Sequence, residues 1–375
     1  MAKMKLGKFA AITGPIALVP LALAIAIPLV ANNYSVTLDT ALGMGKLHVV
    51  PVEGSENWDT EFYTKKYDSA AKSREEANKI SKMISDEGVV LMKNKDNTLP
   101  LAKSAKVSPF GYGYSTPTYG GSGSGNVDTS KDYIATPEKA LKKHFSLVDG
   151  VNAITKDASK ATVVIKEATG TSPAEAGSGM FKNDFSLRGI PTSAYDDVKT
   201  QISGSNAVVF ISRGGGEAND IKRDGYTDGT PHNLTLSQNE KDTIKYAKAA
   251  GASKVIVIIN SSNVMELGEL MSGECEVDAI LWVGGPGAAG FESMSDVMVG
   301  DVNPSGRTAD IYASDLLANP VTKNFGDFVY ANAKYKQADG KEDSAHFVEY
   351  EEGMYLGYRY YVNKLQSKQL DVTAL

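Results

Sequence analysis

The sequence contains little cysteine and little histidine, and these shortages exclude several kinds of site. Its 375 residues include one cysteine, Cys275, and four scattered histidines. A single cysteine cannot form an intramolecular disulfide, and this set does not provide the paired ligands of a structural zinc site. We therefore expect neither a metal ion nor another cofactor.

Basic residues are also too few for a nucleic-acid-binding surface. The chain has 39 basic and 45 acidic residues, for a formal net charge of −6. Without the first 38 residues, which hold three lysines and no acid, that charge becomes −9. Because phosphate backbones attract basic surfaces, we expect no nucleic-acid partner.

The glycine-rich segment 119–126, "YGGSGSGN", lacks the features of the common phosphate-binding and hydrolase motifs. It has neither the third glycine of the dinucleotide motif nor the Gly-Lys pair of a P-loop. A nucleophile elbow requires serine at the position of Gly123. From its residues alone, this segment is a flexible surface loop.

The N-terminal segment lacks ionisable residues over a long span. None occurs between Lys8 and Asp39, and residues 9–31 are mostly apolar. About 20 apolar residues cross a bilayer, and lysines ahead of such a span favour the cytoplasmic side. We predict one membrane-spanning helix over 9–31, at the cell membrane, with the main domain extracytoplasmic. A cleavable signal peptide is the alternative, because Ala31 and the residues at 24–26 resemble a cleavage site.

Beyond a stalk, the sequence alternates between helical and strand patterns. A capping-box pattern at Ser73 and Glu76 predicts the start of a helix that ends at Gly88. Continuous apolar and β-branched runs predict strands buried on both faces. These runs are 89–94, 106–112, 161–166, 206–212, 254–260 and 278–285.

Helix-start signals lie between these runs. Thr136 precedes a proline, and Ser237 and Glu240 form a second capping-box pattern, whose helix ends at Gly251. The alternation predicts an α/β fold with a mainly parallel sheet sandwiched between helices, preceded by one N-terminal transmembrane helix.

One carboxylate, Glu217, follows the predicted strand 206–212 after three consecutive glycines. Open α/β sheets bind ligands beyond the carboxyl ends of their strands, and glycines let the backbone turn sharply there. This places Glu217 at a ligand-binding edge. A single loop carboxylate, however, does not distinguish a catalytic acid from an ordinary loop residue.

Six segments, taken in order, resemble the α/β sandwich (C-terminal-type) domain of glycoside hydrolase family 3, the β-glucosidase and β-xylosidase family. They are "EEANKISKMISDEGVVLMKNKDNTLPL", "VVFISRGGGEANDIKRDG", "LTLSQNEKDTIKYA", "VIVIINSSNVMELGEL", "AILWVGGPGAAGFESMSDVMVGDVNPSGR" and "YEEGMYLGYRYY". The resemblance covers roughly residues 75–361. One segment would be weak evidence, whereas six in the same order are specific.

The resemblance implies a function for the glycine-flanked glutamate. In many members of this family a glutamate in such a loop is the general acid/base, which corresponds here to Glu217. Ala218 replaces a glycine that is usual in the family. The other candidates for the substrate loops are Gly121, Ser122, Gly123, Ser124 and Asp220. The implied reaction is hydrolysis of β-linked oligosaccharides or glycosides with retention of configuration.

The family's nucleophile is an aspartate in an "SDW"-like motif on a separate (β/α)₈ barrel, and this sequence has no such motif. The resemblance thus implies a member with reversed domain order, in which this chain supplies the acid/base half and lacks the barrel and its nucleophile. A non-catalytic, membrane-tethered carbohydrate-binding module is the alternative. The expected organisation is a cytoplasmic basic tail (1–8), the anchor (9–31), a stalk (32–72), the sandwich domain (73–362) and an unassigned tail (363–375).

Overall fold

The computed structural model describes most of the chain beyond residue 65. Its described residues are 20, 23–24, 26–28, 53–54, 66–121, 125–165, 187–215, 232–325, 328–337 and 340–369. The chain divides into two compact units, Met1–Lys66 and Tyr67–Leu375. Within the described ranges, no helix has the length and apolar character needed to cross a membrane. The predicted anchor over 9–31 lies mostly outside those ranges, and it stays a prediction that the structure does not support.

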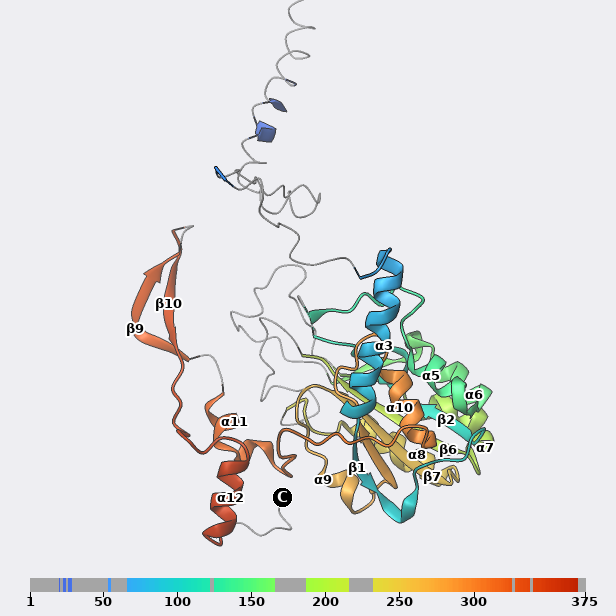
Figure 1. Ribbon diagram of the computed structural model, residues 1–375. Helices are drawn as coiled ribbons and strands as arrows, with labels where there is room; N and C mark the ends of the chain where they lie inside the picture. The colour runs from blue at the N-terminus through green and yellow to red at the C-terminus, as the bar shows by residue number, and fades with distance from the viewer. Residues whose placement is uncertain are drawn as a thin grey trace, which may run out of the picture. The chain divides into compact units, whose positions relative to one another are not determined.

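The second unit is built around a six-stranded sheet (Figure 1). Its strands follow the order β1-β8-β7-β6-β2-β3. The strands are β1 (Val90–Asn94), β2 (Lys106–Phe110), β3 (Ser146–Leu147), β6 (Asn206–Arg213), β7 (Lys254–Ser261) and β8 (Ala279–Trp282). β1 runs antiparallel to β8, and the other neighbours pair in parallel. The predicted mainly parallel sheet is confirmed.

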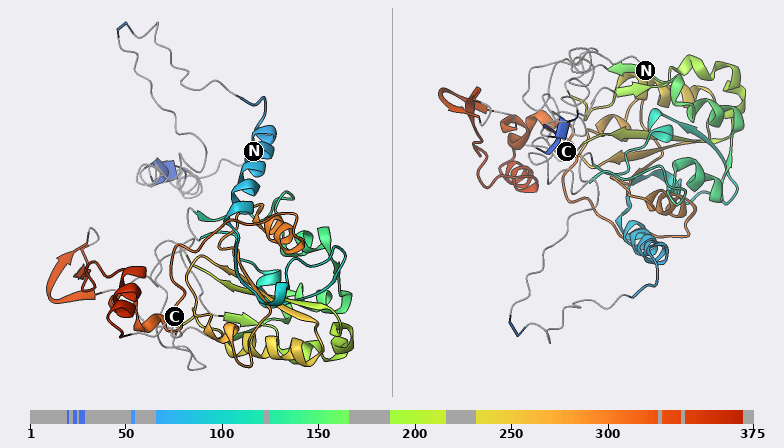
Figure 2. Two further views of the ribbon diagram at one scale, coloured as in Figure 1. Left: turned by 60° about the horizontal axis from the view of Figure 1, so that its bottom comes forward. Right: turned by 90° about the horizontal axis from the view of Figure 1, so that it is seen from above.

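Helices cover both faces of this sheet (Figure 2). The helices of this layer are α3 (Ala70–Gly88), α4 (Tyr112–Ser115), α5 (Pro137–His144), α6 (Asp149–Thr155), α7 (Lys199–Ile202), α8 (Gln238–Ala249), α9 (Gly268–Met271) and α10 (Gly290–Val299). In β6, Val208 and Phe210 belong to a core cluster with α5 and α10, whereas Val209 and Ile211 belong to a cluster with α6, α7 and α8. Successive strand side chains point to opposite faces. Both faces therefore bury apolar side chains, as the unbroken apolar runs predict.

Two of the three predicted helix starts are confirmed. Thr136 caps α5, and Ser237 and Glu240 form the capping box of α8. The box predicted at Ser73 is wrong, because α3 begins four residues earlier than that cap requires and the hydroxyl of Ser69 accepts the capping hydrogen bond. Ser69 has an extended backbone, as a cap requires, and the two alanines after it are strong helix formers.

Two further strand pairs lie outside the main sheet. β4 (Thr162–Ile165) pairs antiparallel with β5 (Leu187–Gly189), so the prediction that run 161–166 joins the parallel sheet is wrong. β4 has no place beside β6 in the main sheet, because β6 is paired with β2 on one side and with β7 on the other. Towards the C-terminus, α11 (Pro320–Asn324) precedes the antiparallel hairpin β9 (Phe328–Lys336) and β10 (Glu342–Phe347), and α12 (Tyr358–Gln366) follows it.

Candidate functional site

A cavity of about 320 Å³ lies at the carboxyl ends of β2 and β6. Its walls come from the glycine-containing turn after β2, the end of β6, β5 and the first turns of α8. This is the edge at which open parallel sheets bind ligands. The position of the cavity therefore agrees with the edge predicted to carry the site.

Glycine is required where the turn after β2 approaches β6. Gly111 has a φ of +90°, which side chains rarely adopt, and a Cβ there would overlap the carbonyl oxygen of Phe210. A Cβ on Gly113 would overlap the hydroxyl of Ser212. These two glycines let the turn after β2 pack directly against β6 and form one wall of the cavity.

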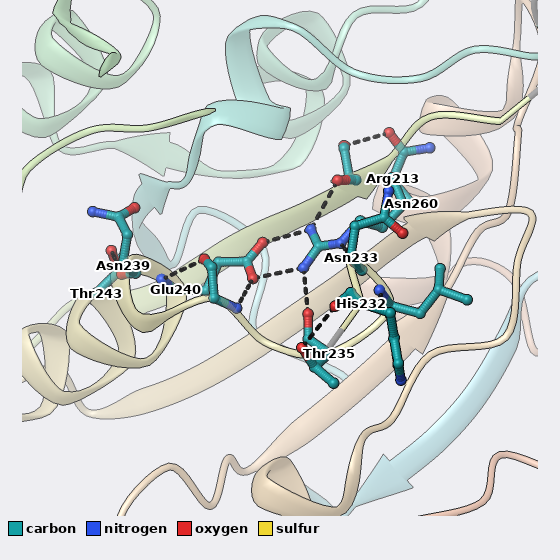
Figure 3. A network of polar contacts seen from close by, with 11 residues as sticks. Arg213, His232, Asn233, Thr235, Asn239, Glu240, Thr243 and Asn260 are labelled. Carbon is teal, nitrogen blue, oxygen red and sulfur yellow. Dashed lines mark hydrogen bonds and ion pairs between the residues drawn. The ribbon is translucent and has the colours of Figure 1, made fainter. Parts of the chain in front are cut away.

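Arg213, the last residue of β6, holds this edge together (Figure 3). Its side chain is 1% exposed and donates to both carboxylate oxygens of Glu240, at 2.7 and 2.8 Å. It also donates to the carbonyl oxygens of Asn233 and of Thr235, the latter at 2.8 Å. The end of β6, residues 233–235 and the start of α8 are thereby joined by bidentate, charge-assisted hydrogen bonds.

Asn260, near the end of β7, connects the segments that follow β2 and β8 with the end of β6. Its Oδ1 accepts from the backbone N–H of Thr118 at 2.8 Å and from the hydroxyl of Ser212 at 2.7 Å. Its Nδ2 donates to the carbonyl oxygens of Thr118 and Gly284, both at 2.7 Å. The side chain is fully buried, and all of its hydrogen-bonding capacity is used.

A buried histidine lies close to this network. His232 is 3% exposed, and its Nδ1 accepts from the backbone N–H of Leu234 at 3.1 Å. Its other nitrogen, Nε2, therefore carries the proton and donates to Glu266 at 3.2 Å. The same Glu266 oxygen accepts from the N–H of Leu316 at 2.7 Å. These contacts give His232 a structural role.

A second charged cluster joins α3, α5 and α10. Asp296 is 5% exposed and accepts from Lys82 at 2.8 Å, Lys143 at 2.8 Å and His144 at 2.6 Å. Burial alone would raise the pKa of Asp296, but the hydrogen bonds from these three cationic or polar partners lower it to about 2. This carboxylate stays charged and stabilises the contact between the helices.

Most of the predicted site residues lie outside the described ranges. These are Glu217 and Asp220 in segment 216–231, and Ser122, Gly123 and Ser124 in segment 122–124. Gly121 is described: it follows Gly120, whose Cα lies beside Gly285 in the turn after β8. Their roles stay predictions.

The sequence reasoning missed Arg213, Asn233 and Asn260. For Arg213 a signal existed, since a charged residue at the end of a buried apolar run needs a partner. Asn260 also ends an apolar run, and it directly precedes two serines. Asn233 has no comparable local pattern. In the described part of the chain, no three His, Cys, Asp or Glu side chains converge as a metal site.

Comparison with known proteins adds an independent finding. A sequence model described as the glycosyl hydrolase family 3 C-terminal domain matches residues 89–358. Thermostable beta-glucosidase B of Acetivibrio thermocellus is 27% identical over 299 residues, which cover 80% of this chain and 32% of that protein. Beta-glucosidase A of Butyrivibrio fibrisolvens is 26% identical over 293 residues, covering 73% of this chain and 31% of the relative.

Solved structures show the same arrangement. Beta-glucosidase 3B from Thermotoga neapolitana, in complex with glucose, has a TM-score of 0.55 and 26% identity, over 77% of this chain and 36% of that one. A beta-glucosidase from Paenibacillus barengoltzii, at 23% identity, also has a TM-score of 0.55 and shares the fold. The chain spans about a third of the length of these relatives.

Proposed function

This chain belongs to glycosyl hydrolase family 3 through its C-terminal-type α/β domain, and we propose that it supplies the acid/base half of a retaining β-glucosidase-type enzyme. The observation that carries this proposal is the family match over residues 89–358 together with relatives named as beta-glucosidases. The substrate in this proposal is a β-linked glucoside or oligosaccharide.

The described geometry supports a role for the carboxyl edge of the sheet. β6 ends at Arg213, four residues before Glu217, at the edge that also carries the cavity. Arg213 and Asn260 hold the backbone on both sides of that edge in place. A rigid scaffold beneath a loop is the usual support for a catalytic side chain.

In the proposed reaction, Glu217 donates a proton to the leaving oxygen and then activates a water molecule. A retaining glycosidase needs a second carboxylate about 5 to 5.5 Å away as the nucleophile. In this proposal that group belongs to a (β/α)₈ barrel domain, joined to this chain or supplied as a partner. The charge of the nucleophile would keep the pKa of the acid/base glutamate high enough for proton donation.

The test compares leaving groups in a complete protein that contains the barrel. Glu217→Ala should reduce hydrolysis of glucosides with poor leaving groups by about 10² to 10⁴-fold, and that of activated aryl glucosides much less, because only the former need proton donation. Steady-state kinetics on both substrates measures this. Glu274→Gln, at a carboxylate that is 83% exposed, is the control and should leave both rates unchanged.

Equal losses on both substrates would contradict the acid/base role. The chain without a barrel should show no measurable hydrolysis. Turnover by that chain, abolished by Glu217→Gln, would mean that its nucleophile lies within these residues. Sugar binding without any hydrolysis in the complete protein would favour the alternative, a non-catalytic carbohydrate-binding module.

A further inference from the structure

The hairpin of β9 and β10 has an open edge. In the described part of the chain its sheet consists of these two strands, so β9 has a paired neighbour on one side only (Figure 1). None of the nine residues of β9 is buried. A two-stranded hairpin alone is marginally stable, and an open strand edge is a template for pairing with another strand. The open edge of β9 is therefore a candidate surface for a further strand.

One face of β9 is apolar along its whole length. Side chains alternate between the two faces of a strand, so positions 329, 331, 333 and 335 share one face. The residues at these positions are Val329, Ala331, Ala333 and Tyr335. Val329 is 49% exposed and Tyr335 is 48% exposed. An exposed apolar face beside an open strand edge indicates a protein partner.

The opposite face of β9 is complementary to a reversed copy of itself. Its aromatic residues, Phe328 and Tyr330, lie in the first half of the strand, and Lys334 and Lys336 lie in the second half. A second β9 that ran antiparallel, centred on Asn332, would place its Lys334 opposite Tyr330 and its Lys336 opposite Phe328. Lysine side chains pack well on aromatic rings, and cross-strand neighbours lie close enough for this contact.

The same register also matches the apolar face. It places Val329 opposite Tyr335 of the second copy and Ala331 opposite Ala333, and pairs of an aromatic with a β-branched residue stabilise sheets. No two like charges lie opposite each other. A parallel, in-register pair would instead bring each lysine beside the same lysine of the other copy, which is unfavourable. The charges of β9 therefore select the antiparallel arrangement.

We propose that β9 is a self-association surface, at which two copies of this chain pair antiparallel about Asn332 into a four-stranded sheet, β10-β9-β9-β10. Such a contact uses the same patch on both copies and closes on itself, so it yields a dimer. Two nine-residue strands bury a small area, and we expect a dissociation constant of about 10 to 100 µM. The proposal goes beyond the hydrolytic function, because it uses neither Glu217 nor the cavity.

Cysteine cross-linking tests the register. In the proposed dimer the two copies of residue 332 face each other with Cα atoms about 4.5 to 5.5 Å apart, within reach of a disulfide. Asn332→Cys in the full chain, at about 200 µM with oxidised glutathione, should give a cross-linked dimer on a non-reducing gel. The parent, whose Cys275 is buried, should give none. Lys336→Cys is the matched control and should give none, because its two copies lie about 27 Å apart.

Analytical ultracentrifugation measures the strength of the dimer. The full chain, from about 1 to 200 µM, is kept in a fixed concentration of non-ionic detergent because residues 9–31 are mostly apolar. Asn332→Lys places two like charges opposite each other and should weaken the dimer by about fivefold. Asn303→Lys, the same change at an exposed position outside the hairpin, should leave it unchanged.

Urea denaturation at about 1 µM, well below the expected dissociation constant, separates association from folding. Position 332 is exposed in the single chain, so Asn332→Lys and the parent should unfold at the same urea concentration. If Asn332→Lys fails to fold, the cross-linking of Asn332→Cys decides.

Four outcomes would overturn the proposal. They are a chain that stays monomeric up to about 200 µM, association that Asn332→Lys leaves unchanged, cross-linking of Lys336→Cys as strong as that of Asn332→Cys, and loss of the Asn332→Cys cross-link in a complete protein that contains the barrel. The last result would assign the edge of β9 to the barrel. Hydrolysis by the complete protein should not change in Asn332→Lys, so each proposal can fail without the other.

Discussion

Two strand pairs, β6 with β7 and β9 with β10, differ in how much of their side-chain surface is buried. β6 and β7 pair in parallel, and nearly all of their side chains are buried, whereas the nine residues of β9 include none that is buried. In the hairpin, cross-strand aromatic contacts take the place of a core: the rings of Tyr330 and Phe347 lie 4.6 Å apart. Strand geometry alone therefore does not stabilise a pair, and the stability of a pair depends on what covers its faces.

The largest effect should come from the end of β6. Arg213→Met should lower the free energy of unfolding by about 3 to 5 kcal/mol, because the partly buried Glu240 loses its partner and two buried carbonyl oxygens lose their donor. Urea denaturation measures the change. Lys334→Met, at an exposed position of β9, is the matched control and should change stability by less than about 0.5 kcal/mol. Similar losses of stability in both variants would mean that the end of β6 and the surface of the hairpin do not differ in this way.

Core packing should give the next effect. Ile258→Ala in β7 removes a fully buried side chain and should lower the free energy of unfolding by about 3 kcal/mol through lost apolar burial and the cavity left behind. Val329→Ala in β9, where the side chain is 49% exposed, should cost less than about 1 kcal/mol. Equal destabilisation in denaturant titrations would show that the hairpin has a packed face after all.

A smaller, pH-dependent effect should distinguish a buried carboxylate from an exposed one. Asp296→Asn should cost about 2 kcal/mol at pH 7, since three hydrogen-bonding partners lose the charge they pair with. Because the folded state lowers the pKa of Asp296 to about 2, its contribution is present above about pH 4 and is lost as the pH falls towards 2.

Denaturant titrations of parent and variant across that pH range measure this effect. Their difference should narrow as the pH falls from about 4 to about 2. The control is Asp343→Asn in β10, whose carboxylate accepts from Gln337 at 2.7 Å on the surface, and it should cost less than about 0.5 kcal/mol. A difference between parent and Asp296→Asn that stays constant with pH would contradict the assignment.

The features that the sequence predicts are those that depend on residues close together in the chain. Runs such as 206–212 and 254–260 are predictable because a strand buried on both faces must be apolar throughout. The caps at Thr136 and Ser237 are predictable because the partners of a capping residue lie within three positions of it.

Other features depend on contacts that no local pattern contains. Arg213 and Glu240 are 27 positions apart, and they meet only because β6 ends beside the start of α8. The cavity is lined by Asn233 and by residues in or next to β2, β5 and β6, and these come together only in the folded chain. The start of α3 differs from the prediction because the extended backbone ends at Ser69, although only Ser73 is followed three positions on by a glutamate.

The saturated amide of Asn260 has a consequence for engineering this fold. Its amide nitrogen donates to the carbonyl oxygens of Thr118 and Gly284, and its oxygen accepts from the backbone N–H of Thr118 and the hydroxyl of Ser212, so no other side chain reproduces the set. Even aspartate, of the same shape, would turn two attractions into repulsions. Designs that graft new loops onto these strand ends should therefore keep Asn260, the hydroxyl of Ser212 and the backbone paths at Thr118 and Gly284.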